Sequence, residues 1–72
     1  MSFKTYILNT NPDAADHEVH VLYECTHLPA FSNRENLGMF ETCQSAVKEA
    51  KKRYPNWDIN GCFYCSYDCH TG

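Results

Sequence analysis

The chain has 72 residues, with nine acidic side chains, six basic side chains and a net charge of −3 when its four histidines are neutral. This length fits one domain, residues 1–72, and below about 70–80 residues a fold usually needs a metal, disulfides or oligomerisation for stability. The acidic balance argues against a phosphate-binding surface, so no nucleic-acid partner is expected. No apolar segment approaches the roughly 20 residues of a membrane-spanning helix, so no membrane association is expected either.

The N-terminal residues and the cysteines bear on the cellular compartment. Residues 1–6 lack the apolar segment and cleavage site of a secretory signal, which predicts a cytoplasmic protein. In that compartment thiols stay reduced, so the five cysteines are expected to bind metal or to react rather than to form disulfides. An odd number of cysteines also fits poorly with a fully paired disulfide framework.

Two strand candidates occupy the first third of the chain. Residues 3–8 alternate between two faces and are rich in aromatic and β-branched side chains, as a strand is. Residues 9–13 have the Asn, Pro and Asp of a turn. Residues 18–23 form the second candidate, and its expected apolar face holds Val19, Val21 and Tyr23. Together these segments predict a hairpin with a long polar connection.

The clearest element of the second half is a helix. Residues 26–36 are expected to form a loop, and residues 37–40 are the candidate for a short third strand. The helix begins after the N-cap Thr42 and stops before Pro55, because the residue preceding a proline avoids the α region. Its expected apolar face consists of Cys43, Ala46, Val47, Ala50 and Tyr54. Cys43 is therefore expected to be a core residue rather than a metal ligand.

These elements predict an α+β fold. A small antiparallel sheet, made of the hairpin and the candidate third strand, is packed by one helix. A C-terminal cysteine turn follows and is expected to attach to the end of the second strand.

The strongest functional signal is the pair Cys62-x-x-Cys65 directly after Gly61. Zinc prefers tetrahedral thiolate and imidazole ligands, and this spacing lets one tight turn present two sulfurs to one ion. The remaining ligands are expected from either of two pairs: His20 with Cys25, or Cys69 with His70. The other histidines, His17 and His27, are expected to be exposed and unliganded. Disulfides and plain buried thiols are the competing interpretations of the cysteines.

The chain resembles the Ada-type metal-binding module, a family named for bacterial DNA-alkylation repair, over about residues 18–65. The residues that carry the resemblance are, in order, His20, Cys25, Pro29, Asn36, Phe40, Ala46, Gly61, Cys62 and Cys65. The chain is also similar to a set of short bacterial proteins that end in a Gly-Cys-x-Tyr-Cys…Cys-His pattern, which here spans Gly61 to His70.

The Ada-type resemblance implies one metal site with four ligands: His20, Cys25, Cys62 and Cys65. In the DNA-repair members a ligand thiolate accepts a methyl group from a phosphotriester. This chain departs from the pattern, because it has one additional residue between His20 and Cys25 and continues to Cys69 and His70, which remain alternative ligands. It also lacks a basic surface, so methyl transfer from DNA is not expected.

The function that these observations favour is a structural zinc-binding domain, since four protein ligands leave no open coordination position for catalysis. No enzymatic activity is therefore expected, and a partner, if the domain has one, is expected to be a protein. Two alternatives remain open. One is a thiol-reactive or metal-handling protein that uses the C-terminal cysteines, and the other is a metal-free domain with buried or disulfide-paired cysteines.

Overall fold

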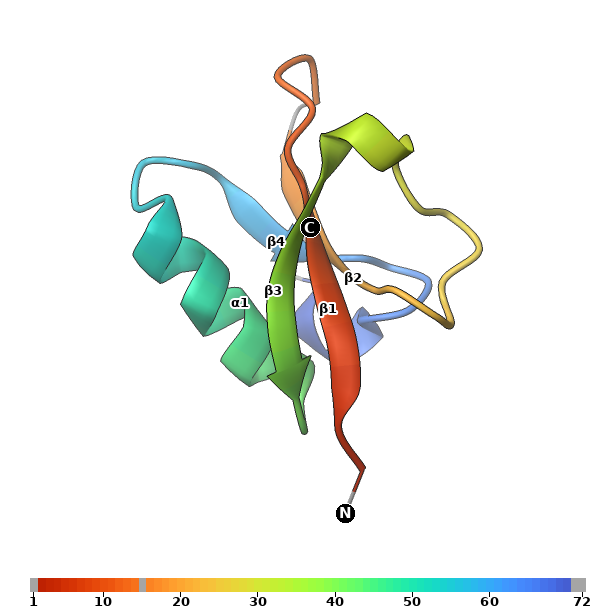
Figure 1. Ribbon diagram of the computed structural model, residues 1–72. Helices are drawn as coiled ribbons and strands as arrows, with labels where there is room; N and C mark the ends of the chain where they lie inside the picture. Colours follow the sequence, from red (N-terminus) through yellow and green to blue (C-terminus); the bar gives the residue numbers. More distant parts are fainter. Residues whose placement is uncertain (1, 15, 71–72) are drawn as a thin grey trace.

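The computed structural model describes residues 2–14 and 16–70, which fold into a four-stranded sheet covered by one α-helix (Figure 1). The predicted α+β class is confirmed. The strand order in the sheet is β3-β1-β2-β4. The elements in chain order are β1 (Lys4–Asn9), β2 (His17–Val21), the 3-10 turn η1 (Phe31–Asn33), β3 (Arg34–Phe40), α1 (Cys43–Arg53), β4 (Ile59–Gly61) and the 3-10 turn η2 (Tyr67–Cys69).

Strands β1 and β2 form the predicted antiparallel hairpin. Leu8 pairs with Val19 in the register of the two strands, and both side chains are fully buried in the core. The connection is shaped by asparagine side chains, since Asn9 and Asn11 each accept a hydrogen bond from the backbone N–H two residues further on. Because β4 pairs with the other side of β2, β2 is an interior strand of the sheet.

Strand β2 is shorter than expected and ends at Val21. The backbone N–H groups of Glu24 and Cys25 both donate to the Val21 carbonyl, at 3.3 and 3.0 Å, so the chain turns away from the sheet. Tyr23 consequently lies outside the strand and is 83% exposed, and its expected place on the buried face is wrong. The turn carries Cys25 back over the end of the strand.

Strand β3 is longer than the predicted residues 37–40. Residues 34–36, expected as loop, pair with β1 along the edge of the sheet. The pairing shifts register next to Gly38, whose φ of 108° is a conformation that residues with a side chain rarely adopt. Arg34, Glu35 and Asn36 are all polar, so this part of the strand gives no apolar alternation in the sequence.

The helix α1 matches its prediction. Thr42 is the N-cap, and its hydroxyl oxygen accepts from the Ser45 N–H, which satisfies a free amide of the first turn. Ala46 and Ala50 are fully buried, and these small side chains let the helix approach the sheet closely. Arg53, in the last turn, donates to the carbonyls of Asn36 and Leu37 and so covers part of the exposed edge of β3.

Strand β4 is absent from the sequence-based prediction, and it changes the sheet from antiparallel to mixed. It pairs in parallel with β2, and Gly61 lies opposite Val19. Three residues with no apolar alternation give little sequence signal, and parallel pairing is decided by the connection through α1. The Cys62 N–H continues this pairing by donating to the Val19 carbonyl at 3.0 Å. The strand thereby carries the C-terminal cysteines to the end of β2.

Among the described residues, no helix combines the length and the apolar character that crossing a membrane requires.

Candidate metal centre

Four side chains from distant parts of the chain meet beside the end of β2: His20, Cys25, Cys62 and Cys65. Their ligand atoms all lie within 4.8 Å of one another. His20 belongs to β2, Cys25 to the turn after it, and the other two to the segment that follows β4. These are the four residues that the Ada-type resemblance implied, so the additional residue between His20 and Cys25 does not separate their side chains.

The distances in this cluster resemble the edges of a metal tetrahedron. Ordinary zinc–ligand bond lengths imply edges of about 3.8 Å between two sulfurs and about 3.6 Å between a sulfur and a nitrogen. The Cys25 Sγ lies 3.7 Å from the Cys62 Sγ and 3.5 Å from the His20 Nδ1. The Cys65 Sγ lies 3.9 Å from the same nitrogen. The side chains are thus already spaced as ligands around one small ion.

Backbone hydrogen bonds hold the sulfurs in place. The Val21 N–H donates to the Cys65 Sγ at 3.3 Å, and the His27 N–H donates to the Cys25 Sγ at 3.4 Å. In the C-terminal turn, the Ser66 N–H donates to the Cys62 carbonyl at 2.8 Å, which closes the CxxC segment on itself. Amides that donate to a sulfur stabilise its thiolate form, which is the form that binds metal.

The histidine presents one nitrogen to the cluster and the other to a carboxylate. His20 Nδ1 faces the sulfurs, whereas Nε2 lies 3.8 Å from the Glu18 Oε1. Glu18 and His20 are two residues apart on β2, so their side chains share a face. Metal-binding histidines commonly direct their second nitrogen toward such a group, which orients the ring and raises its basicity. Glu18 is the residue of this site that motif spacing did not reveal.

Burial controls the protonation of the cluster. The pKa of His20 is lowered to about 4, mainly by burial and further by the charges of Arg34 and His27, so its imidazole is neutral at pH 7. Burial raises the pKa of the Cys62 and Cys65 thiols. Without a cation the interior therefore disfavours thiolates, and a bound metal ion supplies the positive charge that reverses this preference.

Exposure differs among the three thiols. Cys62 is 1% exposed and Cys25 is 9% exposed, whereas Cys65 is partly open to solvent. Three unpaired thiols in such proximity, beside a neutral imidazole, form a strong donor set for a thiophilic metal.

The alternative ligands Cys69 and His70 lie outside this cluster. Cys69 forms a disulfide with Cys43, which joins η2 to the first residue of α1. The expectation that the cysteines avoid disulfides is thus wrong for this pair. Cys43 is buried in the core, as expected, and its sulfur is bonded to that of Cys69. His70 Nδ1 lies 3.1 Å from the Gly61 carbonyl oxygen. Packing of η2 beside the helix start brings together two cysteines that are 26 residues apart.

The two other histidines both contact an aromatic ring. His17 was expected to be exposed, but it is half-buried in β2 and stacks on Trp57 with ring centroids 3.8 Å apart. His27 is exposed, as expected, and stacks on Tyr64 at 3.7 Å. Neither belongs to the group of candidate ligands among the described residues.

Comparison with family models, curated proteins and solved structures finds no match, so none identifies an Ada-type module. The candidate site therefore rests on its own residues and geometry.

Proposed function

We propose that this domain binds one zinc ion through His20 Nδ1 and the sulfurs of Cys25, Cys62 and Cys65, and that the ion stabilises the fold. The observation that carries the proposal is the spacing of these atoms. Three pairs of ligand atoms lie 3.5–3.9 Å apart, which suits tetrahedral coordination of one ion. One nitrogen and three sulfurs form a ligand set that zinc accepts readily. We further propose that the site is related to that of the Ada-type modules.

A structural role follows from the ligand count and from where the ligands lie. Four protein ligands complete the preferred coordination of zinc, which leaves no position for a substrate. The proposed ion would join the turn after β2 to the segment after β4, since Cys25 and Cys62 are 37 positions apart in the sequence. Such a link removes freedom from the unfolded chain and so favours the folded state.

The test is metal content together with ligand variants. Protein with the Cys43–Cys69 disulfide intact should contain one zinc ion per chain by elemental analysis. Cys25→Ser should lose the metal, because it removes one of the long-range ligands. The matched control is the double variant Cys43→Ser/Cys69→Ser. It removes two sulfurs but none of the proposed ligands, so it should keep one zinc ion. Retention of zinc by Cys25→Ser would contradict the proposed ligand set.

A second experiment tests the structural role. Exhaustive chelation should unfold the C-terminal segment and lower the stability of the whole domain, since structural zinc contributes about 10–16 kcal/mol of binding free energy at pH 7. Circular dichroism and amide exchange before and after chelation measure the change. An unchanged spectrum and unchanged amide protection in metal-free protein would contradict a structural ion.

The observed disulfide favours one alternative, a metal-free domain with further paired cysteines. In that case Cys25 and Cys62, whose sulfurs are 3.7 Å apart, would form a second disulfide. A free-thiol count separates the two proposals. In purified protein with the Cys43–Cys69 disulfide formed, chelation under denaturing conditions yields the three thiols of Cys25, Cys62 and Cys65 from the zinc protein, whereas the metal-free alternative yields only one.

The same count, made on protein quenched with an alkylating agent inside cells, tests the proposed cytoplasmic location. In a reducing compartment, Cys43 and Cys69 should be alkylated together with the other thiols. Protection of this pair from alkylation would instead indicate an oxidising compartment.

A further inference from the structure

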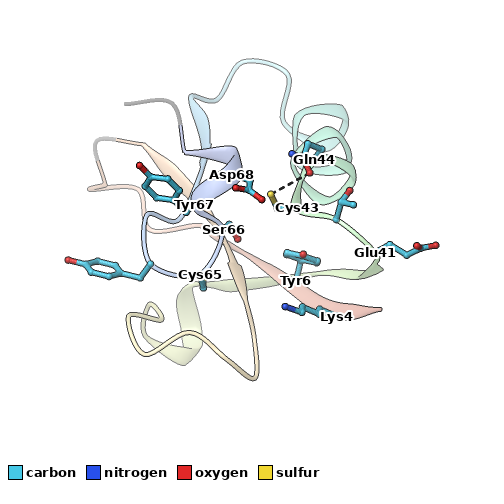
Figure 2. A pocket seen from close by; sticks show the side chains of 11 residues that line it. Lys4, Tyr6, Glu41, Cys43, Gln44, Cys65, Ser66, Tyr67 and Asp68 are labelled. Carbon is cyan, nitrogen blue, oxygen red and sulfur yellow. Dashed lines mark hydrogen bonds between the residues drawn. The ribbon is translucent and has the colours of Figure 1, made fainter. Parts of the chain in front are cut away.

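The candidate metal centre is shielded unevenly, and its accessible side lies next to a cavity. Cys65 lines an open cavity of about 390 Å³ between the C-terminal segment and the start of α1. Figure 2 shows Cys65, Ser66 and Tyr67 along one side of this cavity and Cys43 and Gln44 along the other. Cys25 and Cys62 do not line it and are buried. A small polar molecule in this cavity therefore approaches the cluster from the side of Cys65.

We infer that Cys65 is the oxidation site of this domain, where the metal-bound thiolate attacks a peroxide and its oxidation triggers release of the ion. The inference rests on the proposed zinc site. Reactivity of a cysteine follows its thiolate character and its access to solvent, and zinc coordination keeps all three sulfurs as thiolates. Position then distinguishes the three residues, since Cys65 is the one that is not fully buried and that lines the cavity.

The chemistry proceeds in two balanced steps. The Cys65 thiolate attacks one oxygen of hydrogen peroxide, the O–O bond breaks, and a sulfenic acid and hydroxide form. The thiolate of Cys25 or Cys62 then attacks the Cys65 sulfur, an S–S bond forms, and a second hydroxide leaves. Overall, two thiolates are oxidised by two electrons to a disulfide, and one peroxide is reduced to two hydroxides.

The geometry supports the second step. The sulfurs of Cys25 and Cys62 both lie within 4.8 Å of the Cys65 sulfur, so either can reach the sulfenic acid with a small movement of its side chain. The disulfide removes two of the three sulfur ligands from the ion. The remaining thiolate and His20 are too few to hold zinc in a closed tetrahedral site, and the ion leaves. The Cys43–Cys69 pair is already oxidised and takes no part.

The first experiment uses wild-type protein with one zinc ion per chain and the Cys43–Cys69 disulfide formed. A small excess of hydrogen peroxide is added, zinc release is followed with a chromogenic indicator, and sulfenic acid is trapped with dimedone and located by mass spectrometry. We expect zinc release to accompany oxidation, with the first dimedone adduct on Cys65. A first adduct on Cys25 or Cys62, or no release of zinc while thiols are oxidised, would overturn the inference.

Two ligand variants provide a matched comparison. Cys65→His replaces the accessible thiolate by an imidazole ligand, and its zinc release should be slower by roughly tenfold or more, since the remaining thiolates are buried. Cys62→His removes a buried thiolate instead and should release zinc at a rate within about threefold of wild type. Equal slowing in both variants would contradict a special role for Cys65. If either variant fails to load zinc, the wild-type trapping experiment alone decides.

The metal content measured before peroxide is added separates this inference from the function on which it rests. Protein that loads no zinc contradicts the zinc proposal, and the inference with it. Protein that loads one zinc ion but resists peroxide, or oxidises first at a buried thiol, contradicts only the inference.

Discussion

At the scale of single residues, the candidate centre depends on how His20 is oriented. Its Nδ1 lies among the sulfurs and its Nε2 lies 3.8 Å from the Glu18 carboxylate, so the ring has a defined direction before any ion arrives. Burial lowers the pKa of the imidazole to about 4, which leaves the ring neutral at physiological pH. A neutral, oriented imidazole is the form that binds metal without losing a proton.

Glu18→Gln should weaken zinc binding by roughly 10–100-fold, because the carboxylate that orients and polarises the imidazole is replaced by a neutral amide. The control is Glu24→Gln, which removes an exposed carboxylate paired with Lys4 and should leave the zinc affinity unchanged. Competition against a fluorescent zinc indicator measures both affinities. An equal affinity for Glu18→Gln and wild type would show that Glu18 has no influence on the ligand.

The protonation of the cluster makes zinc binding depend on pH. Burial raises the pKa of Cys62 and Cys65, so their thiols hold protons at pH 7 in the metal-free protein, whereas His20 holds none. Binding should therefore release at least two protons, one each from Cys62 and Cys65, and the affinity should fall as the pH falls. Calorimetry in buffers of different ionisation enthalpy counts the protons. Zinc binding to Cys65→His should release about one proton fewer than binding to wild type. Release of no protons by wild type would contradict thiolate ligation.

At the scale of elements, the C-terminal segment is positioned by close packing of η2 on β4. A Cβ atom added at Gly61 would lie 2.5 Å from the Cys69 Cβ and 2.6 Å from the Ser66 carbonyl oxygen. No side chain fits there unless the backbone moves. The glycine thus permits η2 to lie directly against the strand, which places the CxxC segment at the end of β2 and Cys69 beside α1.

Gly61→Ala should destabilise the domain by roughly 1–3 kcal/mol, because the added methyl group overlaps with the backbone of η2. The same substitution in a Cys43→Ser/Cys69→Ser background is the control, since η2 is then free to shift and the penalty should be smaller. Urea unfolding of the zinc-loaded proteins measures the free energies. Equal penalties in both backgrounds would mean that the disulfide does not hold η2 against the strand.

At the scale of the whole molecule, the disulfide and the proposed metal site involve the same C-terminal segment. The proposed metal site joins residues 62 and 65 to residues 20 and 25, and the disulfide joins Cys69 to Cys43. The sheet supplies little further restraint there, because β4 contributes three residues. The disulfide therefore restrains the last element of this 72-residue chain, and the proposed metal site would add a second restraint, of the kind that small domains with limited cores need.

The double variant Cys43→Ser/Cys69→Ser should be less stable than wild type by about 2–4 kcal/mol, since the disulfide closes a loop between residues 26 apart and restricts the unfolded chain. Denaturant unfolding of both zinc-loaded proteins measures the difference, and reduction of wild type should reproduce it. Identical stabilities would contradict a stabilising role for this bond.

Local sequence patterns determined much of the fold. The hairpin of β1 and β2 follows from alternating apolar residues around an asparagine-rich turn, and α1 follows from helical spacing between Thr42 and Pro55. These signals are local, so the sequence shows them directly. The parallel pairing of β4 and the first residues of β3 gave no comparable signal, because one is a three-residue strand and the other is a polar edge.

The candidate site likewise has one part that local spacing predicts and one part that depends on packing. The sequence alone indicates that Cys62 and Cys65 lie close together, because a spacing of three residues lets one tight turn present both sulfurs on the same side. Their neighbours from distant parts of the chain depend on the tertiary fold, since the parallel pairing of β4 with β2 brings His20 and Cys25 to these sulfurs. The same packing brings Cys69 to Cys43 and so removes it from the ligand set. Pairings across 26 or more residues depend on how the elements pack, which local spacing does not encode.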